Sequence, residues 1–175
     1  AFHIVDFMIG IPDENFIPMT IGASGVKVYN QLTYANLIHS SLKFDYRLTD
    51  YIFWNNQLQY SYGKDSENRN LPFISPLQYQ SQLQYKKNQF QTEVTIRGNA
   101  TQSNYSSFYG ENSTPDYVIL NASAGYNFKW NSQKLMLNVG VENAFDTYYS
   151  TFTDWNNIPR MGRNVFVNLI YNFKK

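Results

Sequence analysis

Cysteine is absent from the 175-residue chain, which excludes disulfides and thiolate metal sites. Charged residues make up only 15%, against about 25% in a typical soluble domain. The net charge of +1 gives no electrostatic basis for binding nucleic acid. No apolar run approaches the roughly 20 residues of a transmembrane helix, and there is no nucleophile elbow or zinc-type histidine spacing. We therefore expect no enzyme, no catalytic residue and no cofactor.

Aromatic and uncharged polar side chains fill the sequence instead. Aromatics account for 18% of the residues, with 15 Tyr and 13 Phe. Asn, Gln, Ser and Thr take many of the remaining positions. Such a mixture suits a protein whose surface meets lipid on one side and water on the other.

Apolar and polar residues alternate with a period of two, which is typical of β-strands with two different faces. In 76–86, for example, leucines and tyrosines occupy one face and four glutamines the other. The pattern predicts about eight strands, over residues 1–9, 26–48, 52–63, 76–86, 89–100, 116–128, 134–145 and 162–173. Most are near the roughly 9–11 residues with which a tilted strand crosses a bilayer. The stretch 26–48 is longer and is expected to project beyond the membrane.

The connections alternate in length. Short turns are predicted at 48–51, 86–88 and 129–134, and long polar loops at 10–25, 64–75, 101–115 and 146–161. Short periplasmic turns and long extracellular loops are typical of outer-membrane barrels, and an even number of strands places the C-terminus in the periplasm.

Aromatic residues are predicted at both ends of the apolar faces. Tyr60, Tyr62, Tyr79, Tyr117 and Phe145 lie near the long loops, a second set lies near the short turns, and aliphatic residues lie between, as in the girdles of a membrane barrel. A soluble β-sandwich or lipocalin-like barrel gives no reason for this placement. The sequence thus predicts an all-β fold, an antiparallel transmembrane β-barrel segment of about eight meander strands.

The last forty residues carry a specific motif. Its members are Gly140, Val141, Glu142, Asn143, Phe145, Asp146, Tyr148, Tyr149, Pro159, Arg160, Gly162, Arg163 and Phe173. This segment resembles the C-terminal end of TonB-dependent outer-membrane receptors, and the strands upstream look similar. The resemblance implies that the final strand is the signal read by the barrel-assembly machinery, through Val165, Val167, Leu169, Tyr171 and Phe173. Lys174 and Lys175 follow Phe173, which departs from the usual pattern.

Members of that family join a barrel of about 22 strands to an N-terminal plug and a TonB-contacting box, neither of which matches a segment here. We therefore expect 1–175 to be a single C-terminal portion of such a barrel. The implied partners are the rest of the barrel and the plug, TonB through the plug, and the lipid and lipopolysaccharide of a Gram-negative outer membrane. The implied function is TonB-dependent import of a metal or metal complex, such as a ferric siderophore or copper. The alternative is a complete eight-stranded barrel with a structural or adhesive role.

Aromatic residues in two long loops are candidates for ligand binding, because they could stack on a flat ligand or pack as loop clusters. They are Tyr105, Phe108, Tyr109, Tyr148, Tyr149, Phe152 and Trp155.

The first loop also looks like the corresponding loop of TonB-dependent copper receptors. It suggests a metal site from Met8, Met19, His3 and His39, because thioethers select Cu(I), although methionine is also a common filler of loops.

Two arginines of the motif offer a further interaction. Arg160 and Arg163 are expected to pair with Asp146, Asp154 or lipopolysaccharide phosphates, or only to shape a loop. Gly162 is expected to permit a tight transition from loop to strand.

Overall fold

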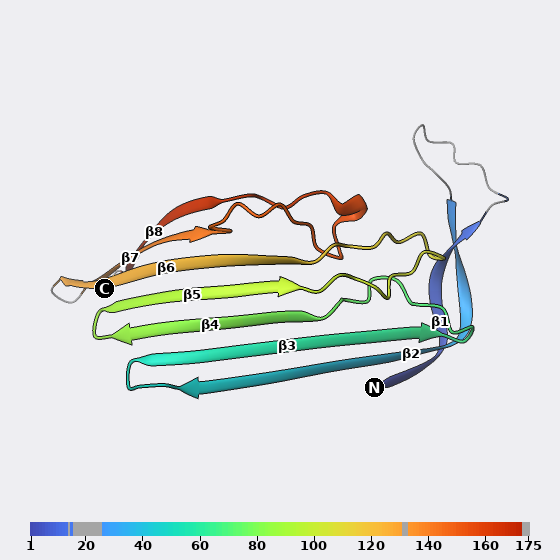
Figure 1. The fold of residues 1–175 in the computed structure, drawn as a ribbon, viewed down its shortest axis with the longest axis horizontal. Coiled ribbons are helices and arrows are strands. Elements are labelled where there is room, and N and C mark those ends of the chain that lie inside the picture. The colour runs from blue at the N-terminus through green and yellow to red at the C-terminus, as the bar shows by residue number, and fades with distance from the viewer. Residues whose placement is uncertain (14, 16–25, 131–132, 173–175) are drawn as a thin grey trace.

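The computed structural model describes residues 1–13, 15, 26–130 and 133–172. Eight strands form one antiparallel sheet in sequence order (Figure 1). They are β1 (Phe2–Asp13), β2 (Val26–Arg47), β3 (Ile52–Asp65), β4 (Gln78–Lys87), β5 (Phe90–Asn99), β6 (Tyr117–Trp130), β7 (Gln133–Glu142) and β8 (Asn164–Asn172). A short 3₁₀ turn, η1 (Trp155–Asn157), is the other element. Within the described ranges, no helix is long and apolar enough to cross a membrane. The predicted all-β meander is confirmed.

The connections differ in length at the two ends of the sheet. Residues 48–51 and 88–89 form short turns at one end, whereas 66–77, 100–116 and 143–163 form long loops at the other (Figure 1). Two boundaries correct the sequence prediction. Residues 10–13 continue β1 because they pair with 26–29 of β2. Strand β7 ends at Glu142, before the predicted boundary, because Asn143 takes a positive φ of 48°.

One face of β4–β8 is apolar and exposed, as the alternation predicts. Leu83 pairs with Val94, and Val139 pairs with Val167. Val167 is 66% exposed, which a soluble core strand would not be. Tyr117 corrects the predicted girdle, because its cross-strand partner is Asn99 of the polar face. Directly paired residues share a face, so Tyr117 lies inside.

The opposite face carries polar side chains in cross-strand rows. The pairing register gives one row of Ser41, Gln59, Gln78, Asn99 and Tyr117, and a second of Lys43, Gln57, Gln80, Arg97 and Ile119. The next row contains Asp45, Asn55, Gln82, Thr95 and Asn121. Glutamine and asparagine occupy eight of the fifteen positions in these three rows.

Strand β2 bends where it meets the loops. Its second half lies beside β3, whereas its first half turns upward with β1 (Figure 1). Leu32 and Ala35 are both buried although three positions separate them, so the alternation of faces changes between them. The change lies at Thr33, opposite Asp6, whose φ is 56° and which skips its pairing. This bulge-like break turns both segments of β2 toward one core.

The core lies under the loops rather than in the middle of the sheet. Ile9, Leu32, Ala35, Leu71 and Tyr109 form it, with Phe7, Ile11, Leu37 and Ile74 packed against it. It joins β1 and β2 to the loops 66–77 and 100–116, so these loops are anchored on the sheet.

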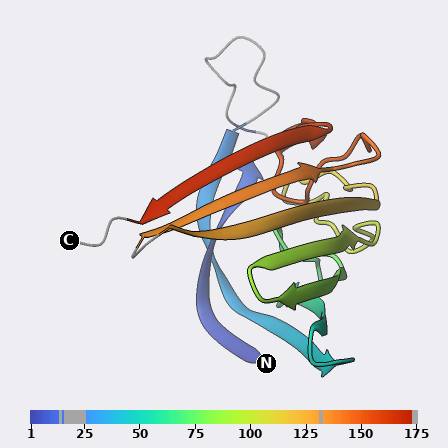
Figure 2. The ribbon, with the colours of Figure 1, turned by 90° about the vertical axis from the view of Figure 1, so that its left-hand side faces the viewer.

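The sheet is curved and has two edges. Figure 2 shows it from one end as a bent wall, with β1 and β2 turned away from the plane of β4–β8. Strands β1 and β8 are its edges, since within the described residues each pairs with a single neighbour.

Adjacent residues on β4 provide a direct test of the membrane-facing side. Leu83→Arg places a charge on the apolar face near mid-strand, which costs about 2–4 kcal/mol in a bilayer. We expect this variant to fold poorly into liposomes, as measured by the heat-dependent shift of the folded band in gels. Gln82→Arg, on the inner face, is the matched control and should fold like the parent. Equal behaviour of the two variants would contradict the assignment of faces.

Candidate functional site

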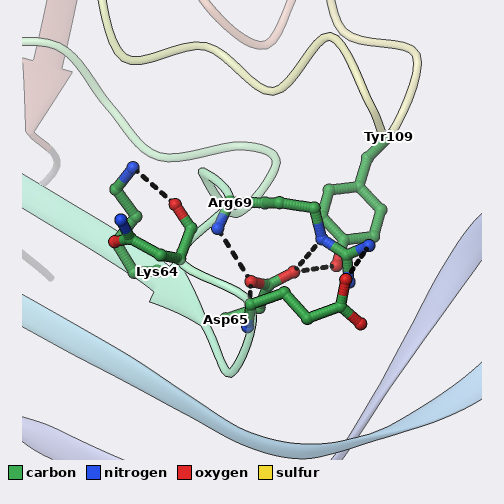
Figure 3. A network of polar contacts seen from close by, with 6 residues as sticks. Lys64, Asp65, Arg69 and Tyr109 are labelled. Atoms are coloured by element: carbon green, nitrogen blue, oxygen red, sulfur yellow. Dashed lines mark hydrogen bonds and ion pairs between the residues drawn. The ribbon is translucent and has the colours of Figure 1, made fainter.

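The loops are held by a buried carboxylate at the end of β3. The side chain of Asp65 is fully buried and forms an ion pair with Arg69 at 2.6 Å. Its Oδ2 also accepts a hydrogen bond from the Tyr109 hydroxyl at 2.7 Å. Its Oδ1 accepts the backbone N–H groups of Glu67 and Arg69 at 2.9 and 2.8 Å. Figure 3 shows Asp65 between Arg69 and Tyr109. We call Asp65, Arg69 and Tyr109 the loop hub.

The hub joins two loops that are 40 residues apart in the sequence. Arg69 lies over the Phe108 ring, with its Cζ 4.1 Å from the ring centroid, and it pairs with Glu67 at 2.9 Å. A buried carboxylate without partners would cost several kcal/mol, and four donors compensate this one. The two loops therefore dock as a unit.

The electrostatics of the hub favour ionised Asp65 and neutral Tyr109. Burial alone would raise the pKa of Asp65, but hydrogen bonds from Tyr109, Arg69 and two amides hold it below its ordinary 3.8. Burial and the Asp65 charge together raise the pKa of Tyr109 to about 12. The hub therefore keeps one protonation state over a wide range of pH.

Glu111 provides a second connection between the same loops. Its carboxylate accepts hydrogen bonds from the amide of Phe73 at 3.1 Å, the side chain of Gln102 at 3.1 Å and the amide of Ser106 at 2.8 Å. Asn70 also donates to the carbonyl of Tyr105 at 3.0 Å.

The motif between β7 and β8 closes the third loop at its base. Asn143 is buried and exchanges two hydrogen bonds of 2.8 Å with the backbone of Thr147. Asp146 accepts the backbone N–H of Arg163 at 2.7 Å. A Cβ at residue 162 would collide with the Asp146 carboxylate, so Gly162 is needed there for close approach. The close contact with Asp146 explains the glycine more specifically than the expected tight transition from loop to strand does.

One of the two predicted arginine pairs is confirmed. Arg160 forms an ion pair with Asp154 at 2.7 Å, and Asp154 also accepts the amide of Thr151 at 2.7 Å. These hydrogen bonds lower the pKa of Asp154. Arg163 contacts Asp146 through its backbone rather than its guanidinium.

A cavity of about 310 Å³ lies on the inner face beneath this loop. Its lining residues are Gln57, Gln59, Gln78, Tyr79, Gln80, Arg97, Gly98, Asn99, Tyr117, Tyr149, Thr151 and Arg160. The rings of Tyr117 and Tyr149 pack with centroids 4.5 Å apart, so two aromatic rings border a set of amides and guanidinium groups. A larger cavity of about 550 Å³ lies between the loops, where Lys27, Phe73, Tyr109 and Phe152 are among its lining residues.

The candidate aromatic residues fall into separate groups. Tyr109 is 1% exposed and structural, Phe108 packs on it edge to face, and Tyr105 contributes its carbonyl to the link with Asn70. Tyr149 and Phe152 line the two cavities. Tyr148 is 80% exposed, and the side chain of Trp155 lies outside the described part.

The candidate copper ligands do not converge in the described residues. His3 hydrogen-bonds Asn36 at 2.7 Å and His39 hydrogen-bonds Ser61 at 3.0 Å. His3 pairs with Asn36 across the two strands and shares its face. Asn36 and His39 are three positions apart on β2, so His3 and His39 lie on opposite faces. Met8 pairs with Gln31, eight residues or roughly 26 Å along the strand from His39. Met19 lies outside the described residues, so Met8 with Met19 stays a prediction.

The proposed assembly signal lies on the outward face of the edge strand. Val165 and Leu169 are 72% and 65% exposed, like Val167 between them. Tyr171 donates a hydrogen bond to Gln133, and Phe173 lies outside the described residues. Recognition by an assembly machine stays a prediction.

Several residues of these sites were not singled out from the sequence. Asp65, Arg69 and Glu111 lie in loops whose composition predicts only turns. Asn99 is one of many amides. Arg97 lies in the predicted strand 89–100, whose pattern gives no local signal of a neighbouring cavity. Long-range contacts create each of these roles.

The geometry defines a class of fold, namely a wall of an outer-membrane-type β-barrel, with one exposed apolar face, one polar face and long loops at one end. No protein-family model and no curated protein matches the chain. Among solved structures, the chain is similar to the "Copper transporter OprC", with a TM-score of 0.81 and 20% sequence identity. The match covers 95% of this chain and 28% of that chain. At this identity the similarity shows the fold, and the chain spans little more than a quarter of the length of OprC.

The loop hub should weaken in acid. Because the pKa of Asp65 is lowered in the folded state, its stabilising contribution is complete above the ordinary value of 3.8 and is lost as the pH falls through the lowered pKa. We expect the Glu67 and Arg69 amides to lose hydrogen-exchange protection, corrected for intrinsic rates, between about pH 4 and pH 2. Asp65→Asn should remove this pH dependence, and ladder amides of β3 and β4 provide the internal reference. Constant protection over this range would contradict the role of Asp65.

Arg160 and Arg163 form a matched pair for testing the third loop. Arg160→Ala removes the partner of Asp154 and should cost about 1 kcal/mol, which raises the open population of the loop about fivefold. Arg163→Ala should change little, because its backbone N–H contacts Asp146. The rate of chymotrypsin cleavage after Phe152 measures opening. Similar rates for both variants would show that the Asp154 pair does not hold the loop.

Proposed function

We propose that this chain is the C-terminal barrel portion of a TonB-dependent outer-membrane transporter that imports a metal or a metal complex. It forms part of the barrel wall and of the loops that gather the substrate outside the cell. The remaining barrel strands, a plug and TonB are the proposed partners, with lipid and lipopolysaccharide around the wall and the C-terminus in the periplasm.

The observation that carries this proposal is the similarity to a copper transporter over 95% of the chain at a TM-score of 0.81. The closing motif supports it independently, because Asp146, Gly162 and Arg163 meet in one contact at the base of a loop. The open edges β1 and β8 favour a portion of a wider barrel over the alternative of a complete small one.

Copper is the proposed cargo, and the ferric siderophore is the second candidate within the same class. The name of the similar structure favours copper, and Met8, 56% exposed near the long-loop end of β1, provides a soft ligand accessible to it. Met8 and Met19 are the proposed thioether pair.

The function is tested by copper accumulation in cells that express the full-length protein. We expect accumulation above that of cells lacking the gene, and loss of this excess when a protonophore collapses the inner-membrane gradient. Accumulation that persists without the gradient would argue against TonB-dependent transport. If the cells take up a ferric siderophore but no copper, the proposed cargo is wrong and the proposed class, a TonB-dependent transporter, stands.

The methionine site has its own matched control. Met8→Ala combined with Met19→Ala should weaken Cu(I) binding by the purified full-length protein at least tenfold. Met161→Ala removes another exposed methionine (71%) and should leave binding unchanged. Unchanged affinity in the double variant would eliminate this site without excluding transport.

A further inference from the structure

We infer that the inner-wall cavity beneath the third loop binds a small oxyanion, such as a carboxylate, with Arg97 as its principal cation. This rests on the proposed function in one respect: it assigns to the cargo, or to a group that chelates it, a negative charge at this wall.

The first observation is an unpaired cation. The side chain of Arg97 has no hydrogen bond or ion pair within the described part of the chain. None of the twelve residues that line the cavity is an acid. The second guanidinium, that of Arg160, is already paired with Asp154. The cavity is therefore positive, and Arg97 supplies the charge that a ligand can use.

The second observation is an unpaired buried donor beside that cation. Asn99 is 3% exposed and lines the same cavity, and its Nδ2 has no partner among the described residues. A buried amide without an acceptor is unfavourable, because it has lost its hydrogen bonds to water. Asn99 lies two residues from Arg97 on the same face, so one acceptor group can approach both.

The register places more donors around this point. Arg97 is opposite Gln80, and Asn99 is opposite Gln78, and Gln57 and Gln59 continue the two rows on β3. Amide N–H₂ groups donate readily to an oxyanion. Tyr117 and Tyr149 form one side of the cavity, which suits a flat group attached to the anion.

Acidic residues limit where the anion can lie. Glu93 and Glu142 line an adjacent hollow of about 260 Å³ that also contacts Arg97. Neither forms an ion pair with Arg97 in the described residues. The ligand is therefore expected on the loop side of Arg97, toward Asn99 and the tyrosines, where it avoids these carboxylates.

Benzoate and benzamide are matched probes, because they share a flat ring and differ in charge. Calorimetry on the full-length protein in detergent at pH 7 should show that benzoate binds more tightly. Arg97→Gln should weaken benzoate binding about tenfold or more, as expected for loss of a charged hydrogen-bond donor, with little effect on benzamide. Arg97→Lys should restore part of the affinity. Arg163→Gln, the same change at an exposed arginine outside the cavity lining, should have no effect.

Three results would overturn the inference: no benzoate binding, equal binding of the two probes, or benzoate affinity that Arg97→Gln leaves unchanged. If benzoate does not bind and Arg97→Gln lowers the melting temperature, Arg97 pairs with a carboxylate elsewhere in the full-length protein. Binding is measured without transport, so failure here leaves the proposed import untouched. Absence of metal uptake would likewise leave a positive benzoate result intact.

Discussion

The period of two along paired strands is the constraint on which the rest of this structure depends. Each cross-strand pair fixes two side chains on the same face, so the pairs from β2 to β8 assign each paired residue to the apolar outer face or to the polar inner face. A slip of one residue would turn the glutamine rows outward and the valines inward. The single change of face, at Asp6 and Thr33, occurs where the sheet must leave the wall and pack against loops. The change of face therefore lies where β1 and β2 begin to pack against the core under the loops.

The loop hub converts two flexible connections into a platform. Asp65 is the last residue of β3, so its position is set by the sheet, and its four donors come from 67–69 and Tyr109. Because a buried carboxylate must be compensated, undocking of residues 66–77 would leave the Asp65 charge without its ion pair, and undocking of residues 100–116 would remove one of its four donors. The same contacts use Tyr109 as a structural anchor in the core. The cavity between the loops therefore has one rigid side and one side formed by the third loop.

Alternation predicted the strands because it is a local property, and the sequence alone located all eight within a few residues. Residues 10–13 fall in a predicted loop, yet they pair with β2 although Gly10 and Pro12 are poor strand formers. The aromatic side chain of Tyr117 suggests a place in the outer girdle. Tyr117 and Ile119 are two residues apart on β6, however, so both lie on the inner face. The hub could not be predicted, since Asp65 and Tyr109 are separated by 44 residues. Likewise, only the fold brings Arg97, Asn99 and Tyr149 around one cavity.

Charges on the inner face are ordered by row. Lys43 and Arg97 belong to one cross-strand row, whereas Asp45 belongs to the next. Adjacent rows on one face are about 6.6 Å apart along the strand, which is shorter than the roughly 8 Å over which physiological salt screens charge. The row of Asp45 therefore lies within electrostatic range of the cationic row. Because Arg97 is two residues from the end of β5 at Asn99, the cationic row is the one nearer the long loops.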